Sequence, residues 1–235
     1  MIQKESKRIM SAPAARALLI VVVFLSLATL RDVIADGNKA FGPVDLGEME
    51  SMVAAFVPDA RYPDDPFILV TLKEAILGNR ERNGGIGACL VREKTGEVVE
   101  RTHNRQYEPY FRSDLHAEMD LLTRYEERVR LTRSRDPGSP SYRNPRNMAG
   151  LVLYTSVEPC PMCLTRLINA GVKKVYYAAS DPEGGMAGRF NALPPFWKAM
   201  AQEMILEPAR CSPELKVLAE KPFRPMAINN KALTK

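Results

Sequence analysis

The sequence has few residues that bind transition metals: two histidines and four cysteines among 235 residues. A motif built from these residue types therefore has few chances to arise by accident. We find no internal repeat and no low-complexity tract. The low cysteine count is no obstacle to folding, because a domain of about 160 residues can bury a full core without disulfide help.

No apolar run reaches the length of a typical membrane span. The longest, residues 17–30, has 14 residues, whereas a transmembrane helix needs about 20. Basic residues precede this run, and Val33-Ile34-Ala35 follows it with small residues suited to signal peptidase. The pattern predicts a signal peptide over residues 1–35 and a protein exported to the periplasm or secreted. The alternative is an uncleaved membrane anchor, with membrane contact through residues 17–30.

Composition beyond this segment is that of an ordinary globular protein. Apolar residues make up 46% and charged residues 26% of the chain. The net charge of +5 permits binding of nucleic acid or phosphate without requiring it. Glycine and proline mark residues 36–63 as a linker, within which residues 48–57 could form a short amphipathic helix. One domain is expected over residues 64–224, followed by a C-terminal tail over residues 225–235.

Within this domain, helical and strand patterns alternate along the chain. Periodicity and turn residues predict helices over residues 66–82, 115–131, 161–170, 195–203 and 213–220. Strands are predicted over residues 86–92, 98–102, 151–155, 175–179 and 204–206. Such alternation predicts an α/β fold, a three-layer α/β/α sandwich with a mixed five-stranded sheet.

Two short motifs carry the chemistry. His116-Ala117-Glu118 comes first, and Pro159-Cys160-Pro161-Met162-Cys163 follows. One imidazole and two thiolates leave a fourth zinc position open, which is typical of a catalytic rather than a structural site. The carboxylate of Glu118 is then free to move protons. H-x-E followed by P-C-x-x-C is the signature of zinc deaminases.

The predicted local structure suits these roles. His116 and Glu118 fall near the start of one helix, and both cysteines fall at the start of another. Helix N-termini present free N–H groups and partial positive charge, which lower the pKa of a thiol. The alternatives are a redox C-x-x-C pair or a closed zinc knot, whose fourth ligand would come from Cys89, Cys211 or His103.

On residues 116–118 and 155–163 the sequence resembles the cytidine deaminase-like superfamily, in the branch with tRNA adenosine, guanine and cytosine deaminases. The resemblance extends more weakly over residues 64–206. It implies Zn2+ held by His116, Cys160 and Cys163, and Glu118 as the catalytic proton carrier. It also implies a homo-oligomer, and a substrate contact from Asn104, for which a simple turn asparagine is the alternative.

The natural substrate is less clearly marked. Residues 110–115 depart from the Asp-Pro-Thr-Ala sequence usual before the histidine in the tRNA and guanine branches. Phe111, Phe190 and Trp197 could stack on a base, but we expect them to be packing residues. The arginine-rich residues 130–147 could grip RNA, and a solvated connection is the favoured interpretation.

Three functions therefore stand. The first is hydrolytic deamination of a small amino-substituted nucleobase or nucleoside, with release of ammonia. The second is deamination of the wobble adenosine of tRNA, against which the predicted export argues. The third, from another class, is a non-catalytic zinc-stabilised binding protein, against which Glu118 argues.

Overall fold

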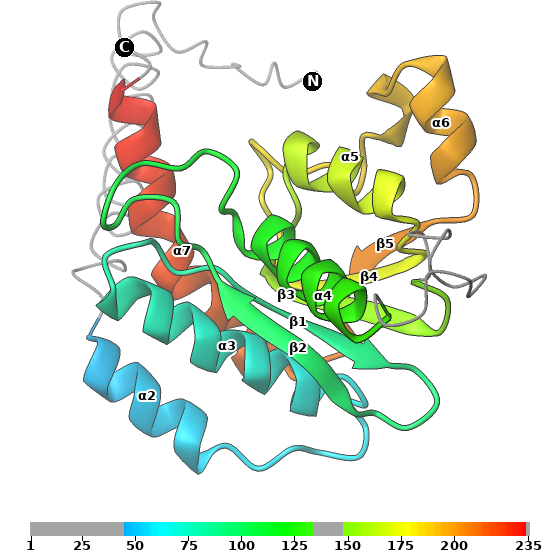
Figure 1. The fold of residues 1–235 in the computed structure, drawn as a ribbon. Helices are drawn as coiled ribbons and strands as arrows, with labels where there is room; N and C mark the ends of the chain where they lie inside the picture. Colours follow the sequence, from blue (N-terminus) through cyan, green and yellow to red (C-terminus); the bar gives the residue numbers. More distant parts are fainter. Residues whose placement is uncertain (1–44, 134–147, 234–235) are drawn as a thin grey trace, which may run out of the picture. The chain divides into compact units, whose positions relative to one another are not determined.

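The computed structural model describes residues 45–133 and 148–233. Five strands form one mixed sheet in the order β2-β1-β3-β4-β5 (Figure 1). The strands are β1 (Gly87–Arg92), β2 (Val98–His103), β3 (Leu151–Val157), β4 (Lys174–Ala179) and β5 (Ile205–Pro208). β1 pairs antiparallel with β2 and β3, whereas β3, β4 and β5 run parallel. The predicted five-stranded mixed sheet is confirmed.

Helices cover both faces of this sheet. They are α2 (Leu46–Ala55), α3 (Asp65–Arg80), α4 (Ala117–Arg133), α5 (Pro161–Ala170), α6 (Pro195–Ala201) and α7 (Pro213–Leu233), with a short 3-10 helix, η2 (Phe190–Ala192). α4 and α5 pack on one face; α2, α3 and α7 pack on the other. The predicted three-layer α/β/α sandwich is therefore confirmed.

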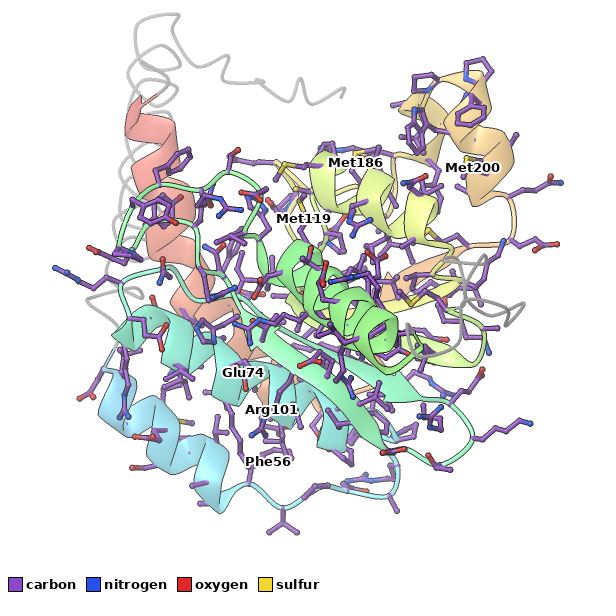
Figure 2. The ribbon with its side chains drawn as sticks, in the orientation of Figure 1. Phe56, Glu74, Arg101, Met119, Met186 and Met200 are labelled. Atoms are coloured by element: carbon purple, nitrogen blue, oxygen red, sulfur yellow. The ribbon has the colours of Figure 1, made fainter. Side chains whose placement is uncertain are left out.

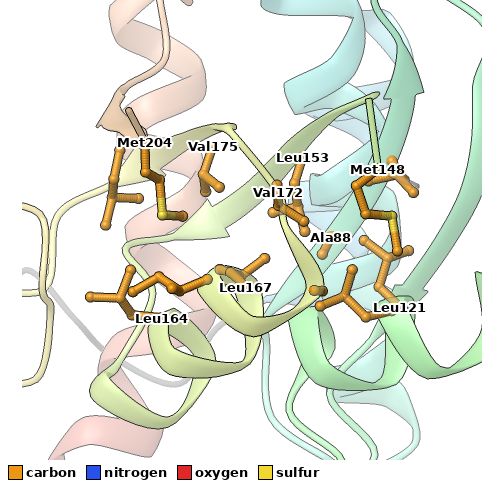
Figure 3. Close-up of a cluster of buried hydrophobic side chains, with 14 of the residues drawn as sticks. Ala88, Leu121, Met148, Leu153, Leu164, Leu167, Val172, Val175 and Met204 are labelled. Carbon is orange, nitrogen blue, oxygen red and sulfur yellow. The ribbon is translucent and has the colours of Figure 1, made fainter. Parts of the chain in front are cut away.

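The central strand β3 supplies both cores. Its residues are all buried, and those from Leu151 to Tyr154 alternate between the two cores. Leu153 joins the cluster beneath α4 and α5, with Leu121 and Leu164 (Figure 3). Its neighbour Tyr154 points to the opposite core. By the same alternation Thr155 faces α4, which places a hydroxyl on the side of the sheet where the metal motifs lie.

The start of α5 follows directly from its sequence. Cys160 is the N-cap residue, with extended φ and ψ of −73° and 171°, and Pro161 opens the helix. Proline is tolerated there because the first helical N–H has no partner within the helix. Gly171 ends the helix in the left-handed region, at φ 79°. The observed bounds are those predicted for residues 161–170.

Two helices extend beyond the sequence predictions. α2 lies within the predicted linker, residues 36–63, where it begins two residues before the short helix expected over residues 48–57, and it buries Met49 and Val53 in the core beneath α3. α7 continues to Leu233, beyond the predicted helix end at residue 220. The predicted signal segment, residues 1–35, lies outside the described residues, as does most of the basic segment 130–147.

Candidate active site

Both cysteines of the P-C-x-x-C motif lie in the first turn of α5. Cys160 is half-buried, Cys163 is buried, and both are free thiols. They are three positions apart along the chain, so the two side chains share one helical face. The free N–H groups and partial positive charge of the helix start favour thiolates at this position.

His116 brings an imidazole to these sulfurs from the start of α4. Its Nδ1 lies 3.8 Å from Sγ of Cys160 and 3.5 Å from Sγ of Cys163. The three potential ligand atoms all lie within 4.8 Å of one another, so a single ion could contact all of them. One nitrogen and two sulfur donors form a set suited to Zn2+. The donor set therefore fits zinc, and the predicted ligands are brought together by the fold.

The electrostatics of this cluster favour a bound cation. A hydrogen bond from Cys163 is the main factor lowering the pKa of the Cys160 thiol to about 4. The same hydrogen bond and burial raise the pKa of Cys163. Burial works to lower the pKa of His116, but its interactions with Cys160 and Glu118 raise it overall. Both cysteines would bind a metal ion as thiolates, so metal binding would release protons from this cluster.

The carboxyl group of Glu118 lies directly beside the cluster. Glu118 is only 4% exposed, and its Oε2 lies 3.3 Å from Sγ of Cys163. Its Oε1 accepts a hydrogen bond from the hydroxyl of Thr155 at 3.1 Å. Burial raises the pKa of Glu118, which makes its carboxylate a better proton acceptor. The predicted catalytic residue and the predicted metal ligands therefore share one site.

Thr155 is a site residue whose role the sequence did not reveal. It belongs to the motif spanning residues 155–163, but a buried threonine in a strand is common and carries no chemical signal by itself. Only the alternation of β3 indicates that its side chain faces α4. The hydrogen bond to Glu118 gives this hydroxyl a role in orienting the carboxylate.

Glu158 supports the site without entering it. Its Oε1 accepts a hydrogen bond from the amide of Ala187 at 2.8 Å, and its Oε2 accepts one from the amide of Asp181 at 3.1 Å. The amide of Met186 donates to the carbonyl of Pro159 at 3.1 Å. The loop after β4 is therefore bonded to the residues just before Cys160. In Figure 2 the label Met186 marks this loop, and the label Met119 marks the start of α4, next to Glu118.

Asn104, the predicted substrate contact, follows β2 and is 1% exposed. Its side-chain amide donates a hydrogen bond to the main-chain carbonyl of Asn83. Its main-chain amide donates to the carbonyl of Ile86 at 2.9 Å. These contacts fix Asn104 in the protein, and its contact with substrate stays a prediction.

The segment leading to His116 lines a cavity of about 630 Å³ together with residues of α4 and of the α3–β1 connection. Leu115 and Tyr110 contribute to its lining. Tyr110 is 64% and Phe111 is 63% exposed. The expectation that Phe111 packs in a core is wrong, because its ring is exposed and contacts the ring of Tyr107. Phe190 and Trp197 pack against the core beneath α5, as expected.

Comparison with known proteins supports this site. Residues 63–179 match the family model described as the cytidine and deoxycytidylate deaminase zinc-binding region. The tRNA-specific adenosine deaminase of Bacillus subtilis is 33% identical over 125 residues, 53% of this chain and 67% of that protein. The enzyme of the same name from Aquifex aeolicus is 30% identical over 128 residues, 54% of this chain and 74% of that protein.

A solved structure shares the fold. A mutant of the protein NE0047 in complex with 8-azaguanine aligns with a TM-score of 0.50 and 17% identity. The alignment covers 70% of this chain and 86% of that one. At this identity the likeness concerns the three-layer architecture alone.

The comparisons overturn the predicted location. Export to the periplasm or secretion, and the alternative of a membrane-anchored protein, are both wrong, because the matching relatives are named as enzymes specific for tRNA. In residues 45–133 and 148–233 no helix has the length and apolar character to cross a membrane. The apolar run was misleading because its composition satisfies the signal-peptide pattern without requiring export.

Matches of this extent show the family to which the chain belongs. Two relatives are at least 30% identical to this chain, and the alignments cover two thirds or more of their length. The zinc-binding region of the family spans His116, Cys160 and Cys163. The chain belongs to the cytidine deaminase-like superfamily and is a zinc-dependent hydrolytic deaminase.

Proposed function

We propose that this deaminase converts adenosine in tRNA, at the wobble position, to inosine with release of ammonia. The matching relatives at 30–33% identity are tRNA-specific adenosine deaminases. The objection from export no longer applies. The exposed rings of Tyr110 and Phe111, on the loop that leads to His116, support a substrate with unstacked bases.

The observation that carries the reaction is the buried Glu118 carboxyl group beside His116, Cys160 and Cys163. Zinc held by those three residues supplies a Lewis acid that makes water nucleophilic near neutral pH. Glu118 takes one proton from the attacking water and delivers it to the ring nitrogen next to the amino-bearing carbon. It takes the second proton as the carbonyl forms and passes it to the departing amine, so water and aminopurine yield ammonia and the oxopurine.

The hydroxyl of Thr155 and the burial of the Glu118 carboxyl group keep Glu118 ready for this transfer. The hydroxyl of Thr155 fixes one oxygen of the carboxylate and leaves the other directed at the cluster. Burial excludes bulk water and raises the pKa of the carboxyl group toward the working pH. A module that only binds zinc has no use for a buried proton carrier, and this observation opposes the non-catalytic alternative.

A free nucleobase or nucleoside is the second candidate substrate. Around the loop before His116, the described guanidinium groups are paired with carboxylates. Arg105 and Arg124 bind Asp120, and Arg112 binds Asp114. Paired arginines attract phosphates less than unpaired ones do, and this observation favours a small neutral substrate.

An ammonia-release assay on zinc-loaded protein separates the candidates. The panel comprises an anticodon stem-loop RNA with adenosine at the wobble position, the same RNA with guanosine there, and free adenosine, adenine, guanine, cytosine and cytidine. We expect ammonia and inosine from the first RNA only, and neither from a Glu118→Ala variant that retains its zinc.

Two outcomes contradict the proposal. Faster turnover of a free base or nucleoside than of the RNA would assign the second candidate. Full zinc occupancy without ammonia from any member of the panel would favour a non-catalytic binding role. The homo-oligomer is a further part of the proposal, and light scattering of the purified protein tests it.

A further inference from the structure

A buried carboxylate on α4 has no part in the proton transfer described above. Asp120 is 2% exposed and lies one helical turn beyond His116, whose carbonyl accepts a hydrogen bond from the Asp120 amide at 2.9 Å. A charge buried to this degree is costly unless it is paired and hydrogen-bonded. Its partners therefore indicate what the fold gains by keeping it.

Three side chains satisfy this carboxylate. Arg105 donates to both oxygens, through Nη2 to Oδ1 at 2.6 Å and through Nε to Oδ2 at 3.0 Å. The hydroxyl of Thr102 donates to Oδ2 at 2.8 Å. Nε of Arg124, one turn along α4, lies 2.8 Å from the same oxygen. The two hydrogen bonds from Arg105 fix the orientation of its guanidinium group relative to the Asp120 carboxylate as well as the distance between them, because the two planar groups pair side by side.

Two partners of Asp120, one on β2 and one on the loop after it, lie on either side of the predicted base contact in the chain. Thr102 and Arg105 flank His103 and Asn104 in the chain. Asp120 therefore holds the main chain on both sides of Asn104 against α4, the helix that carries Glu118. The relative position of the predicted base contact and the proton carrier depends on these bonds.

Asn83 holds the same segment from the other side. Its carbonyl accepts the Asn104 side-chain amide, and its Oδ1 accepts the amides of Tyr107 and Glu108 at 2.8 and 2.7 Å. Arg105 closes the loop further, since its amide donates to the carbonyl of Leu115 at 2.9 Å. Asn104 is thus held between the α3–β1 connection and α4, and the Asp120 contacts bond its neighbours Thr102 and Arg105 to the helix of Glu118.

We propose that Asp120 is a positioning residue that sets the distance between Asn104 and Glu118 and so controls recognition of the substrate base. This inference rests on the proposed function, since it takes Asn104 to contact the base. Asp120 acts through Asn104 and does not itself touch the substrate. A loosened Asn104 weakens base binding, so loss of Asp120 raises KM more than it lowers kcat.

A double-mutant cycle tests this coupling. Asp120→Asn keeps the shape of the side chain but removes the charge that pairs with Arg105. In the otherwise unchanged protein we expect kcat/KM to fall about tenfold or more, with zinc content unaltered. In an Asn104→Ala background the same substitution should lower kcat/KM less than about twofold, because the residue it acts through is gone.

A matched control is another buried carboxylate. Asp65, at the start of α3 on the opposite face of the sheet, accepts hydrogen bonds from the amide and hydroxyl of Ser212. Asp65→Asn should lower stability, and its effect on kcat/KM should be the same with Asn104 or Ala at position 104. If Asp120→Asn does not fold, Arg105→Lys removes the paired contact from a partly exposed side chain and carries the same expectation.

Hydrogen exchange gives a second readout that needs no turnover. The amides of Asn104 and Arg105 are bonded to the carbonyls of Ile86 and Leu115. They should exchange faster in Asp120→Asn but not in Asp65→Asn. The inference would be overturned if Asp120→Asn lowered kcat/KM by the same factor with Asn104 or Ala at position 104. It would also be overturned if exchange at these two amides were unchanged in Asp120→Asn. If the wild-type protein turns over no substrate, the proposed function fails. The hydrogen-exchange result then tests by itself whether Asp120 holds the segment around Asn104.

Discussion

The hydroxyl of Thr155 donates a hydrogen bond to Oε1 of Glu118 at 3.1 Å, between two buried side chains. The bond joins the central strand β3 to the first turn of α4. It leaves Oε2 as the oxygen directed at Cys163 and the ligand cluster. A carboxylate held in this way needs no reorganisation before it accepts a proton, which is an advantage for a proton carrier.

Thr155→Val tests this orienting role, since it replaces the hydroxyl with a methyl group of similar size. We expect kcat to fall about tenfold, which corresponds to about 1.4 kcal/mol and lies near the range for hydrogen bonds to charged groups. Zinc content should be unchanged. Thr165→Val, at a half-buried position on α5, is the matched control. A wild-type kcat in Thr155→Val would show that the bond has no catalytic consequence.

The ligand set predicts which cysteines hold zinc. Cys160→Ser and Cys163→Ser should each lose most of the bound metal after dialysis, whereas Cys211→Ala, a buried thiol outside the cluster, should keep about one zinc per chain. Elemental analysis of the purified variants measures the difference. Removal of zinc by a chelator should also lower the Tm of the wild-type protein, because a ligand bound only to the folded state stabilises it. Stoichiometric zinc in Cys163→Ser would remove that residue from the ligand set.

Gly185 is predicted to be intolerant of any side chain. A Cβ at this position would lie 2.2 Å from the carboxyl carbon of Glu158, which is fixed by the amides of Asp181 and Ala187. Gly185→Ala should therefore lower the free energy of unfolding by about 1–3 kcal/mol. Gly188→Ala, in the same loop, meets no atom within 4 Å and should be neutral or slightly stabilising. Urea unfolding of both variants provides the comparison, and equal stability would contradict the close contact.

His103 predicts a pH dependence of stability. Its Nδ1 lies 3.0 Å from Glu74 and its Nε2 lies 2.9 Å from Glu81, with Arg101 also bonded to Glu74 (Figure 2 labels Glu74 and Arg101). Burial works to lower the pKa of His103, but the two carboxylates raise it above 6.5 overall. The stabilisation is therefore fully present below about pH 6.5 and is lost as pH rises through the folded-state pKa.

The variant His103→Gln measures this contribution. The difference in unfolding free energy between wild type and variant should be larger at about pH 6 than at about pH 9. Other titrating groups, including the zinc site, are common to both proteins and cancel in the difference. An equal difference at both pH values would show that protonated His103 does not stabilise the fold.

By itself the sequence determined the parts of this protein that depend on local spacing. Cys160 and Cys163 are one helical turn apart, so their shared face follows from the helix. The alternation of apolar runs and turn residues fixed the sheet and its two helical layers. His116 and Glu118 were found for the same reason, because their motif is short and continuous.

Only the tertiary structure decided the contacts between segments distant in the chain. Neither Thr155 nor Asp120 carries a chemical pattern in the sequence, and their roles appear only when β3 and β2 pack against α4. Phe111 has the character of a packing residue, and only the structure shows that its ring is exposed. The sequence allows a short helix over residues 48–57, but the burial of Met49 and Val53 in a core is decided only when α3 lies against them. Burial and hydrogen bonding between the sheet and its helices depend on packing. Packing brings together residues that are far apart in the chain, so local sequence patterns do not reveal these contacts.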